Sequence, residues 1–151
     1  MEIVSFAGTY AFLSNFYLTE VCYKNHLYPS TEHAFQAAKT FSLVEQSCFY
    51  IQTNLQNNIT PGKAKRLGKK VTLRSDWDWW VKLAVMEDIL NIKFQDPVLR
   101  MKLLATGDAK LVEGNYWHDT FWGVCDGQGL NHLGRILMYI RNKIRTETLK
   151  I

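Results

Sequence analysis

Two long segments of the chain repeat apolar residues at the spacing of an α-helix, and this repeat constrains the fold more than any other feature. The first begins at Ser75 and Asp78, which resemble a capping box, and runs to about Phe94. The second begins near Asn131. The apolar rows are Trp79, Leu83, Met86 and Leu90 in the first segment and Leu133, Ile136, Leu137, Ile140 and Ile144 in the second. Each row needs a partner that buries it, so the chain is predicted to be rich in packed helices.

End signals predict two shorter helices, one between Thr60-Pro61 and Gly68 and one between Asp96-Pro97 and Gly107. Short extended pieces precede them. Strand-like residues occupy Ile3–Phe6 and Leu18–Tyr23, and the turn residues before Leu27–Tyr28 indicate a hairpin. Without repeats, low-complexity stretches or a linker, residues 1–151 are predicted to form one α-rich α+β domain with a few short strands near the N-terminus.

Composition limits the class of protein. With 47% hydrophobic and 21% charged residues the chain is folded rather than disordered. The three cysteines, Cys22, Cys48 and Cys125, are odd in number and lack zinc-ligand spacing, which indicates reduced thiols, a cytoplasmic location and no metal site. The chain shows no signal peptide and no apolar run long enough to cross a bilayer, so no membrane association is expected.

Positive charge is concentrated in one segment. Six of the 18 basic residues fall between positions 63 and 74, namely Lys63, Lys65, Arg66, Lys69, Lys70 and Arg74. Such a basic segment attracts phosphate, and Lys69 and Arg74 are candidate ligands for it. A solvated basic surface explains the same pattern.

Glu32 is a candidate functional carboxylate. Ser30 or Thr31 can cap a helix that starts with Glu32 and has the apolar stripe Ala34, Ala37, Ala38 and Phe41. In the first turn the helix dipole and free N–H groups favour a charged carboxylate, which suits a base or an electrostatic stabiliser. Gln36 and Lys39 share its face of the helix. The alternative is a polar face that looks at water.

Lys93 is unusual because it continues an apolar helical row by three residues, which directs its stem inward. A lysine that snorkels to solvent explains this equally well.

The segment Leu111–Gly123, "LVEGNYWHDTFWG", combines carboxylates with aromatic residues and has no clear period. An apolar core tolerates aromatic residues but not unpaired carboxylates, so Asp119 among Trp117, Phe121 and Trp122 indicates a site. Trp122 is a candidate for stacking on a base, although aromatic residues more often belong to a core. A thiol–imidazole pair of His118 and Cys125 is not supported by closeness in sequence.

Seven segments of the sequence match motifs of a known family, in the same order along the chain. They are "FLSNFY" (Phe12–Tyr17), "YPSTEHAFQAAK" (Tyr28–Lys39), "PGKAKRLGK" (Pro61–Lys69), "RSDWD" (Arg74–Asp78), "KF" (Lys93–Phe94), "LLATGDAKLVEGNYWHDTFWG" (Leu103–Gly123) and "GLNHLGRILMYIR" (Gly129–Arg141). Together they resemble the NADAR family, which includes the YbiA-like N-glycosidases.

The resemblance implies a hydrolase that cleaves an N-glycosidic bond between a ribose and a nitrogenous group, without a cofactor. It implies one of two substrates: phosphorylated intermediates of riboflavin synthesis, or ADP-ribose attached to guanine in DNA or RNA. By motif position, the catalytic or substrate-contacting residues of the family fall on Glu32, Trp77, Asp119 and Trp122. Asn15 and Lys39 are implied as supports. His118 lies in a variable stretch and inherits no role.

The chemistry fits two carboxylates. Cleavage of a ribosyl C–N bond develops positive charge at the anomeric carbon, which one carboxylate stabilises while a second group protonates the leaving nitrogen. Glu32 fits the first role and Asp119, among aromatic side chains, fits the second. A non-catalytic module that binds ADP-ribose or a nucleotide is the alternative, and an interaction protein with a basic face is a third. The sequence leaves the substrate, the assignment of acid and base, and the oligomeric state open.

Overall fold

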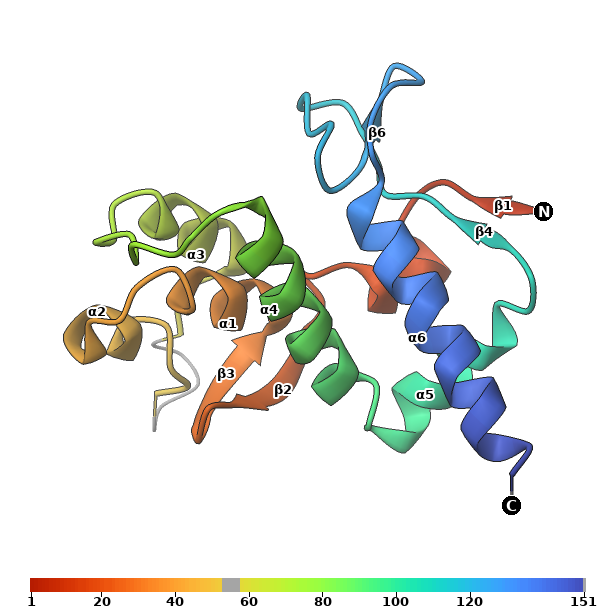
Figure 1. Ribbon diagram of the computed structural model, residues 1–151, viewed down its shortest axis with the longest axis horizontal. Helices are drawn as coiled ribbons and strands as arrows, with labels where there is room; N and C mark the ends of the chain where they lie inside the picture. The colour runs from red at the N-terminus through yellow and green to blue at the C-terminus, as the bar shows by residue number, and fades with distance from the viewer. Residues whose placement is uncertain (53–57, 151) are drawn as a thin grey trace. The chain divides into compact units, whose positions relative to one another are not determined.

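The computed structural model in Figure 1 describes residues 1–52 and 58–150. The chain forms two compact units. Unit 1 consists of Met1–Ser14 and Phe94–Ile151, and unit 2 consists of Asn15–Lys93.

Unit 2 begins with the hairpin that the sequence predicts. Strands β2 (Leu18–Tyr23) and β3 (His26–Ser30) pair antiparallel. Lys24 and Asn25 join them with φ angles of 51° and 67°. Two successive left-handed residues match the right-handed twist of a strand pair, so this turn closes the hairpin tightly. The hairpin is therefore confirmed.

Helix α1 (Thr31–Ala37) follows β3 directly and lies against β2, β3, α3 and α4 (Figure 1). Ser30 is the cap, because its Oγ accepts a hydrogen bond from the His33 N–H at 3.3 Å. Every residue of the helix is buried. The alanines of the predicted apolar stripe are buried. Phe41 is 64% exposed, because the helix ends before it. The prediction for Phe41 was wrong.

His33 ties the start of α1 to the residues before α3. Its Nε2 lies 2.7 Å from the Ile59 carbonyl oxygen and its Nδ1 2.7 Å from Ser30 Oγ. A carbonyl only accepts, so Nε2 carries the proton and Nδ1 accepts from the Ser30 hydroxyl. Burial lowers the pKa of His33, and the hydrogen bond to Ile59 opposes this in part.

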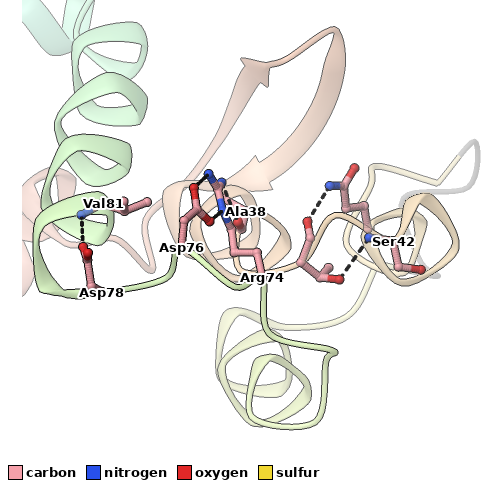
Figure 2. A network of polar contacts seen from close by, with 8 residues as sticks. Ala38, Ser42, Arg74, Asp76, Asp78 and Val81 are labelled. Carbon is pink, nitrogen blue, oxygen red and sulfur yellow. Dashed lines mark hydrogen bonds and ion pairs between the residues drawn. The ribbon is translucent and has the colours of Figure 1, made fainter.

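Three further helices complete unit 2: α2 (Leu43–Ser47), α3 (Pro61–Gly68) and α4 (Trp79–Lys93). Thr60 caps α3, as its position before Pro61 predicts. At α4 the predicted capping box is replaced by Asp78 alone, whose Oδ1 accepts from the Val81 N–H at 2.8 Å (Figure 2). Of the predicted row, Met86 and Leu90 are buried, whereas Trp79 is 59% exposed.

Unit 1 contains most of the short strand pairs. Strand β1 (Glu2–Ile3) pairs parallel with β4 (Lys110–Leu111), and β5 (Gly114–Asn115) pairs parallel with β6 (Val124–Cys125). The predicted strand Ile3–Phe6 is therefore shorter and begins earlier. The 3-10 helix η1 (Gly8–Leu13) and α5 (Pro97–Ala105) complete this part, with Asp96 capping α5 as its sequence predicts.

Helix α6 (His132–Thr148) packs on β4 and α5 within unit 1 (Figure 1). Its apolar row is buried at Leu133, Leu137, Ile140 and Ile144, while Ile136 is half-buried. Gly134 permits the close contact, since a Cβ there would lie 2.1 Å from the Leu111 carbonyl oxygen.

Asn131 fixes the chain between β4 and β5 to the start of α6. Its side-chain Nδ2 donates to the Leu111 carbonyl at 2.9 Å, and its Oδ1 accepts from the Glu113 N–H at 3.0 Å. The predicted α-rich α+β class with few short strands is confirmed. Among the helices of the described residues, none has the length and apolarity that a membrane span requires.

Candidate functional site

Glu32 is the most buried carboxylate among the candidates. Only 7% of it is exposed, and its Oε1 accepts a hydrogen bond of 2.7 Å from Gln36 Nε2. Gln36 is 4% exposed. The interpretation of this helix face as a surface turned to water is therefore wrong. A buried carboxylate is costly unless hydrogen bonds and charges compensate it, so its surroundings indicate a site.

Two N–H groups at the start of α1 already have hydrogen-bond acceptors. The Glu32 N–H donates to the Asn15 carbonyl at 3.0 Å, and the His33 N–H donates to Ser30 Oγ. The expectation that free N–H groups stabilise the Glu32 carboxylate was therefore wrong for these two groups. The side chain of Gln36 supplies a donor instead.

Lys39 lies in a group of positive charges. It is half-buried, and burial is the main cause that lowers its pKa. The positive charges of Lys82, Lys65 and Lys69 lower the pKa further, while the negative charge of Glu32 opposes the shift. Three lysines, from α3, its end and α4, thus lie within electrostatic range of Lys39. Positive charge gathered in this way attracts anions, because an anion offsets the repulsion on Lys39.

Arg74 already has a carboxylate partner. Its Nε and Nη2 contact Asp76 Oδ1 and Oδ2 at 2.5 and 2.7 Å, and its Nη1 donates to the Ala38 carbonyl at 3.3 Å (Figure 2). The guanidinium also lies 4.3 Å from the centre of the Phe41 ring. Arg74 therefore attaches residues 74–76 to the end of α1, which the sequence did not predict.

Trp77 packs beside these groups in unit 2. Its ring centre lies 5.4 Å from that of Phe35 and 5.9 Å from the Arg74 guanidinium. The other members of the basic segment differ in exposure. Lys63, Arg66, Lys69 and Lys70 are exposed, and Lys65 is half-buried.

Lys93 is buried at the end of α4. It is 2% exposed, and its Nζ lies 5.7 Å from the centre of the Tyr17 ring. A lysine that extends its ammonium group to solvent would be more exposed, so the snorkelling explanation is wrong. The inward direction that the apolar row predicted is the one observed.

Asp119 and Trp122 belong to unit 1. Asp119 is half-buried, and its Oδ1 accepts from the N–H groups of Phe121 and Trp122 at 3.1 and 2.9 Å. Trp122 meets Phe121 edge to face with ring centres 4.8 Å apart. Trp117, expected to enclose Asp119, is 49% exposed. The carboxylate therefore organises the local turn.

The structure brings His118 and Cys125 together, which closeness in sequence did not predict. His118 Nδ1 lies 3.9 Å from Cys125 Sγ, and Asp126 Oδ2 lies 3.8 Å from the same sulfur. Within the described ranges, no three or more His, Cys, Asp and Glu side chains are arranged to hold a metal ion.

Three buried polar atoms adjoin Glu32 in sequence or by contact. They are Asn15 Oδ1, Thr31 Oγ1 and Gln36 Oε1, none of which has a hydrogen-bond partner within residues 1–52 and 58–150. Asn15 was a candidate from the sequence, and Gln36 was placed on the helix face of Glu32 without being named a site residue. Thr31 and Lys82 were not singled out as site residues. The closeness of Lys82 to Lys39 arises only in the folded chain, because Lys39 follows α1 and Lys82 belongs to α4.

Comparisons with known proteins agree with one another. The NADAR domain family matches residues 5–145. A riboflavin biosynthesis protein of Vibrio vulnificus is 36% identical over 90% of this chain, which spans only 36% of that longer protein. An N-glycosidase of Nostoc punctiforme is 36% identical, with 90% of this chain and 86% of the relative covered. The NMR structure of the Escherichia coli protein YbiA superposes with a TM-score of 0.82 at 34% identity, covering 99% of this chain and 89% of that one.

Proposed function

The chain belongs to the NADAR family, and from that premise we propose that it is an N-glycosidase that hydrolyses a ribosyl C–N bond. Relatives matched over most of their length are named N-glycosidases, which supports a hydrolase acting on N-glycosyl bonds. The finer part of the proposal is a two-carboxylate mechanism that uses Glu32 and Asp119 and needs no metal or cofactor.

One observation carries the proposal: a carboxylate that is 7% exposed accepts a 2.7 Å hydrogen bond from Gln36 in unit 2, where Lys39 is half-buried among other lysines. An oxocarbenium-like transition state carries positive charge, and a positioned carboxylate stabilises it. The lysines suit the phosphate of the same substrate. Glu32 is assigned to stabilise this charge or to activate water.

Asp119 is assigned to protonate the leaving nitrogen. Its Oδ1 accepts two backbone N–H groups, and among the described residues its Oδ2 accepts none. Oδ2 is therefore the atom from which a proton would be donated. Exchange of the acid and base roles between the two residues is the alternative assignment.

The substrate is proposed to carry phosphate and ribose. Lys39, Lys69 and Lys93 are the proposed phosphate ligands, with Arg74 as a fixed positive charge beside them. Asn15 is proposed to contact the ribosyl group, and Trp77 and Trp122 the nitrogenous ring. Two substrates fit this description: a phosphorylated riboflavin intermediate, and ADP-ribose attached to guanine in nucleic acid.

A binding module without turnover is the second candidate. The basic segment supports it equally, because phosphate binding requires no catalysis. The buried Glu32 distinguishes the two functions, since a negative charge close to a phosphate site weakens binding and is of use only for chemistry.

The test is to incubate the purified protein separately with the pyrimidine riboflavin intermediates and with guanine-ADP-ribosylated DNA. Products are identified by mass spectrometry. Release of a free nitrogenous product from either substrate supports the enzyme and selects the substrate. If the protein binds both substrates and releases no product from either, it is a binding module and the proposed enzyme function fails.

The matched variants are Glu32→Gln and Glu20→Gln. Glu20 is an exposed carboxylate on β2 of the same unit, so its replacement controls for charge. Glu32→Gln is expected to lower turnover by about 10²–10⁴ with little change in binding. Folded Glu32→Gln protein that releases product at the parent rate would refute the assignment.

A further inference from the structure

The side chain of Gln36 occupies a space that only a glycine leaves open. A Cβ added to Gly68, the last residue of α3, would lie 1.8 Å from Gln36 Oε1 and 2.6 Å from Gln36 Cδ. Both are far inside contact distance. Gly68 has no special φ angle, so the backbone does not require glycine there. The amide of Gln36 is what requires it.

The orientation of that amide follows from its neighbours. A carboxylate only accepts hydrogen bonds, so the Nε2 end of Gln36 must face Glu32. The Oε1 end then faces Gly68, and it has no hydrogen-bond partner in the part of the chain that the structure describes. A buried acceptor left in this way costs free energy. The hydrogen bond that the N–H end donates to the Glu32 carboxylate can compensate this cost.

We propose that Gln36 is a positioning residue for Glu32, that its amide holds the carboxylate ionised and in one orientation, and that Gly68 supplies the space for it. This inference rests on the proposed function, because it assigns Gln36 and Gly68 to the same reaction. The N–H donor stabilises the negative charge that the reaction uses. Without it the carboxylate turns and binds a proton more readily.

Other charges act on the same helix and must stay unchanged in a test. Lys39 lies on the chain just after α1, Lys65 and Lys69 belong to α3 or its end, and Lys82 belongs to α4. On α2, Glu45 is bound by Thr40 and by the N–H and hydroxyl of Thr72. On the hairpin, burial is the main cause that raises the pKa of Tyr23 and of Tyr28, so both are neutral. None of these groups is altered by the variants below.

The chain offers a matched pair of glycines in α3. Gly68→Ala places a methyl group where the Gln36 amide lies. Gly62→Ala, in the same helix, meets only Arg66 Nη1 at 3.8 Å and is the control. Gln36→Leu removes the donor directly while keeping a buried side chain of similar size.

Each variant is measured in two ways. The first is the pH dependence of kcat/KM for product release, and the second is the NMR titration of the Glu32 carboxyl carbon. For Gln36→Leu and Gly68→Ala we expect the acid limb and the carboxyl titration to move to higher pH by about 1 unit, with turnover at neutral pH reduced about 10- to 100-fold. Gly62→Ala should match the parent protein in both.

The outcomes separate the two proposals. A merely structural role of Gln36 would lower activity equally at all pH values and leave both midpoints in place, and that result in folded Gln36→Leu or Gly68→Ala overturns the inference. If the parent protein releases no product from any N-glycoside, the proposed function fails. The carboxyl titration then still decides whether Gln36 and Gly68 hold Glu32.

Discussion

Asn115 and Asp119 exchange two hydrogen bonds across the tip of the segment after β5. Asn115 Nδ2 donates to the Asp119 carbonyl at 2.8 Å, and the Asp119 N–H donates to Asn115 Oδ1 at 3.0 Å. With the two N–H groups that its own side chain accepts, Asp119 takes part in four local hydrogen bonds. The position of its carboxylate is therefore set by the loop.

This dual use predicts different outcomes for two replacements of Asp119. Asp119→Asn keeps an oxygen acceptor for the two N–H groups, so stability should change little while turnover falls about 10²–10⁴-fold. Asp119→Ala loses the acceptor as well and should lower the free energy of unfolding by about 0.5–2 kcal/mol. Urea unfolding and product release measure the two effects. An Asp119→Asn protein with parental turnover would remove Asp119 from the mechanism.

The Glu32→Gln and Asp119→Asn changes should not be additive. If both carboxylates act on one bond, the double variant loses less than the product of the two single losses, because removing one partner already disables the step. The measurement is kcat for all four proteins under one condition. Losses that multiply would show that the two residues act independently.

Salt dependence separates the two substrates. If the basic segment binds a polyanion, the affinity for modified DNA should fall with salt at a log–log slope of about −0.7 to −0.9 for each phosphate neutralised. Lys69→Gln should reduce the slope by about one such step, whereas Lys143→Gln, an exposed lysine on α6, should not. A slope near zero with DNA, alongside good turnover of a small metabolite, would exclude the nucleic-acid substrate.

His33 makes stability depend on pH. Burial lowers its pKa in the folded protein, whereas in the unfolded chain it titrates near its usual value of about 6.5. Below that value the unfolded state binds more protons, so stability falls as the pH drops through the folded pKa and is fully present above about 6.5. Urea unfolding between pH 8 and 5 should show this decline. An NMR titration that placed the His33 pKa above 6.5 would reverse the sign.

Chelators should leave turnover unchanged. The proposed steps use carboxylates and backbone donors, and the sequence lacks His or Cys residues at the spacing of a metal site. The assay is product release before and after dialysis against EDTA. Activity that disappears and returns with a divalent cation would contradict the metal-free mechanism.

The sequence predicted best what depends on local signals. The turn before His26, the cap Thr60 and the cap Asp96 act within a few residues, and each was confirmed. It failed where packing decides. Phe41 continues a stripe of alanines but lies beyond the end of α1, and Trp79 starts a row whose first turn is exposed. Periodicity shows which face is apolar, not how far another element covers it.

The candidate site shows the same division. The sequence identified Glu32 and placed Gln36 on the same face of the helix, but it did not predict that both are buried. Their burial depends on the elements between residues 18 and 93 that cover α1. The pairing of Arg74 with Asp76 was missed although the two are close in sequence, since a basic segment by itself does not show which charge is already paired. The contact of His118 with Cys125 depends on the path of the whole loop.

The parallel pairing of Glu2 with Lys110 has a consequence for the order in which a ribosome delivers the chain. Unit 2 is continuous from Asn15 to Lys93, so all its residues are available before α5 is translated. Unit 1 combines Met1–Ser14 with the residues from Phe94 onward, so it needs α6 as well. At about 5–20 residues per second, β1 waits roughly 5–20 s for its partner strand. During synthesis its edge is unpaired, so a nascent chain halted between residues 93 and 110 presents that edge to chaperones.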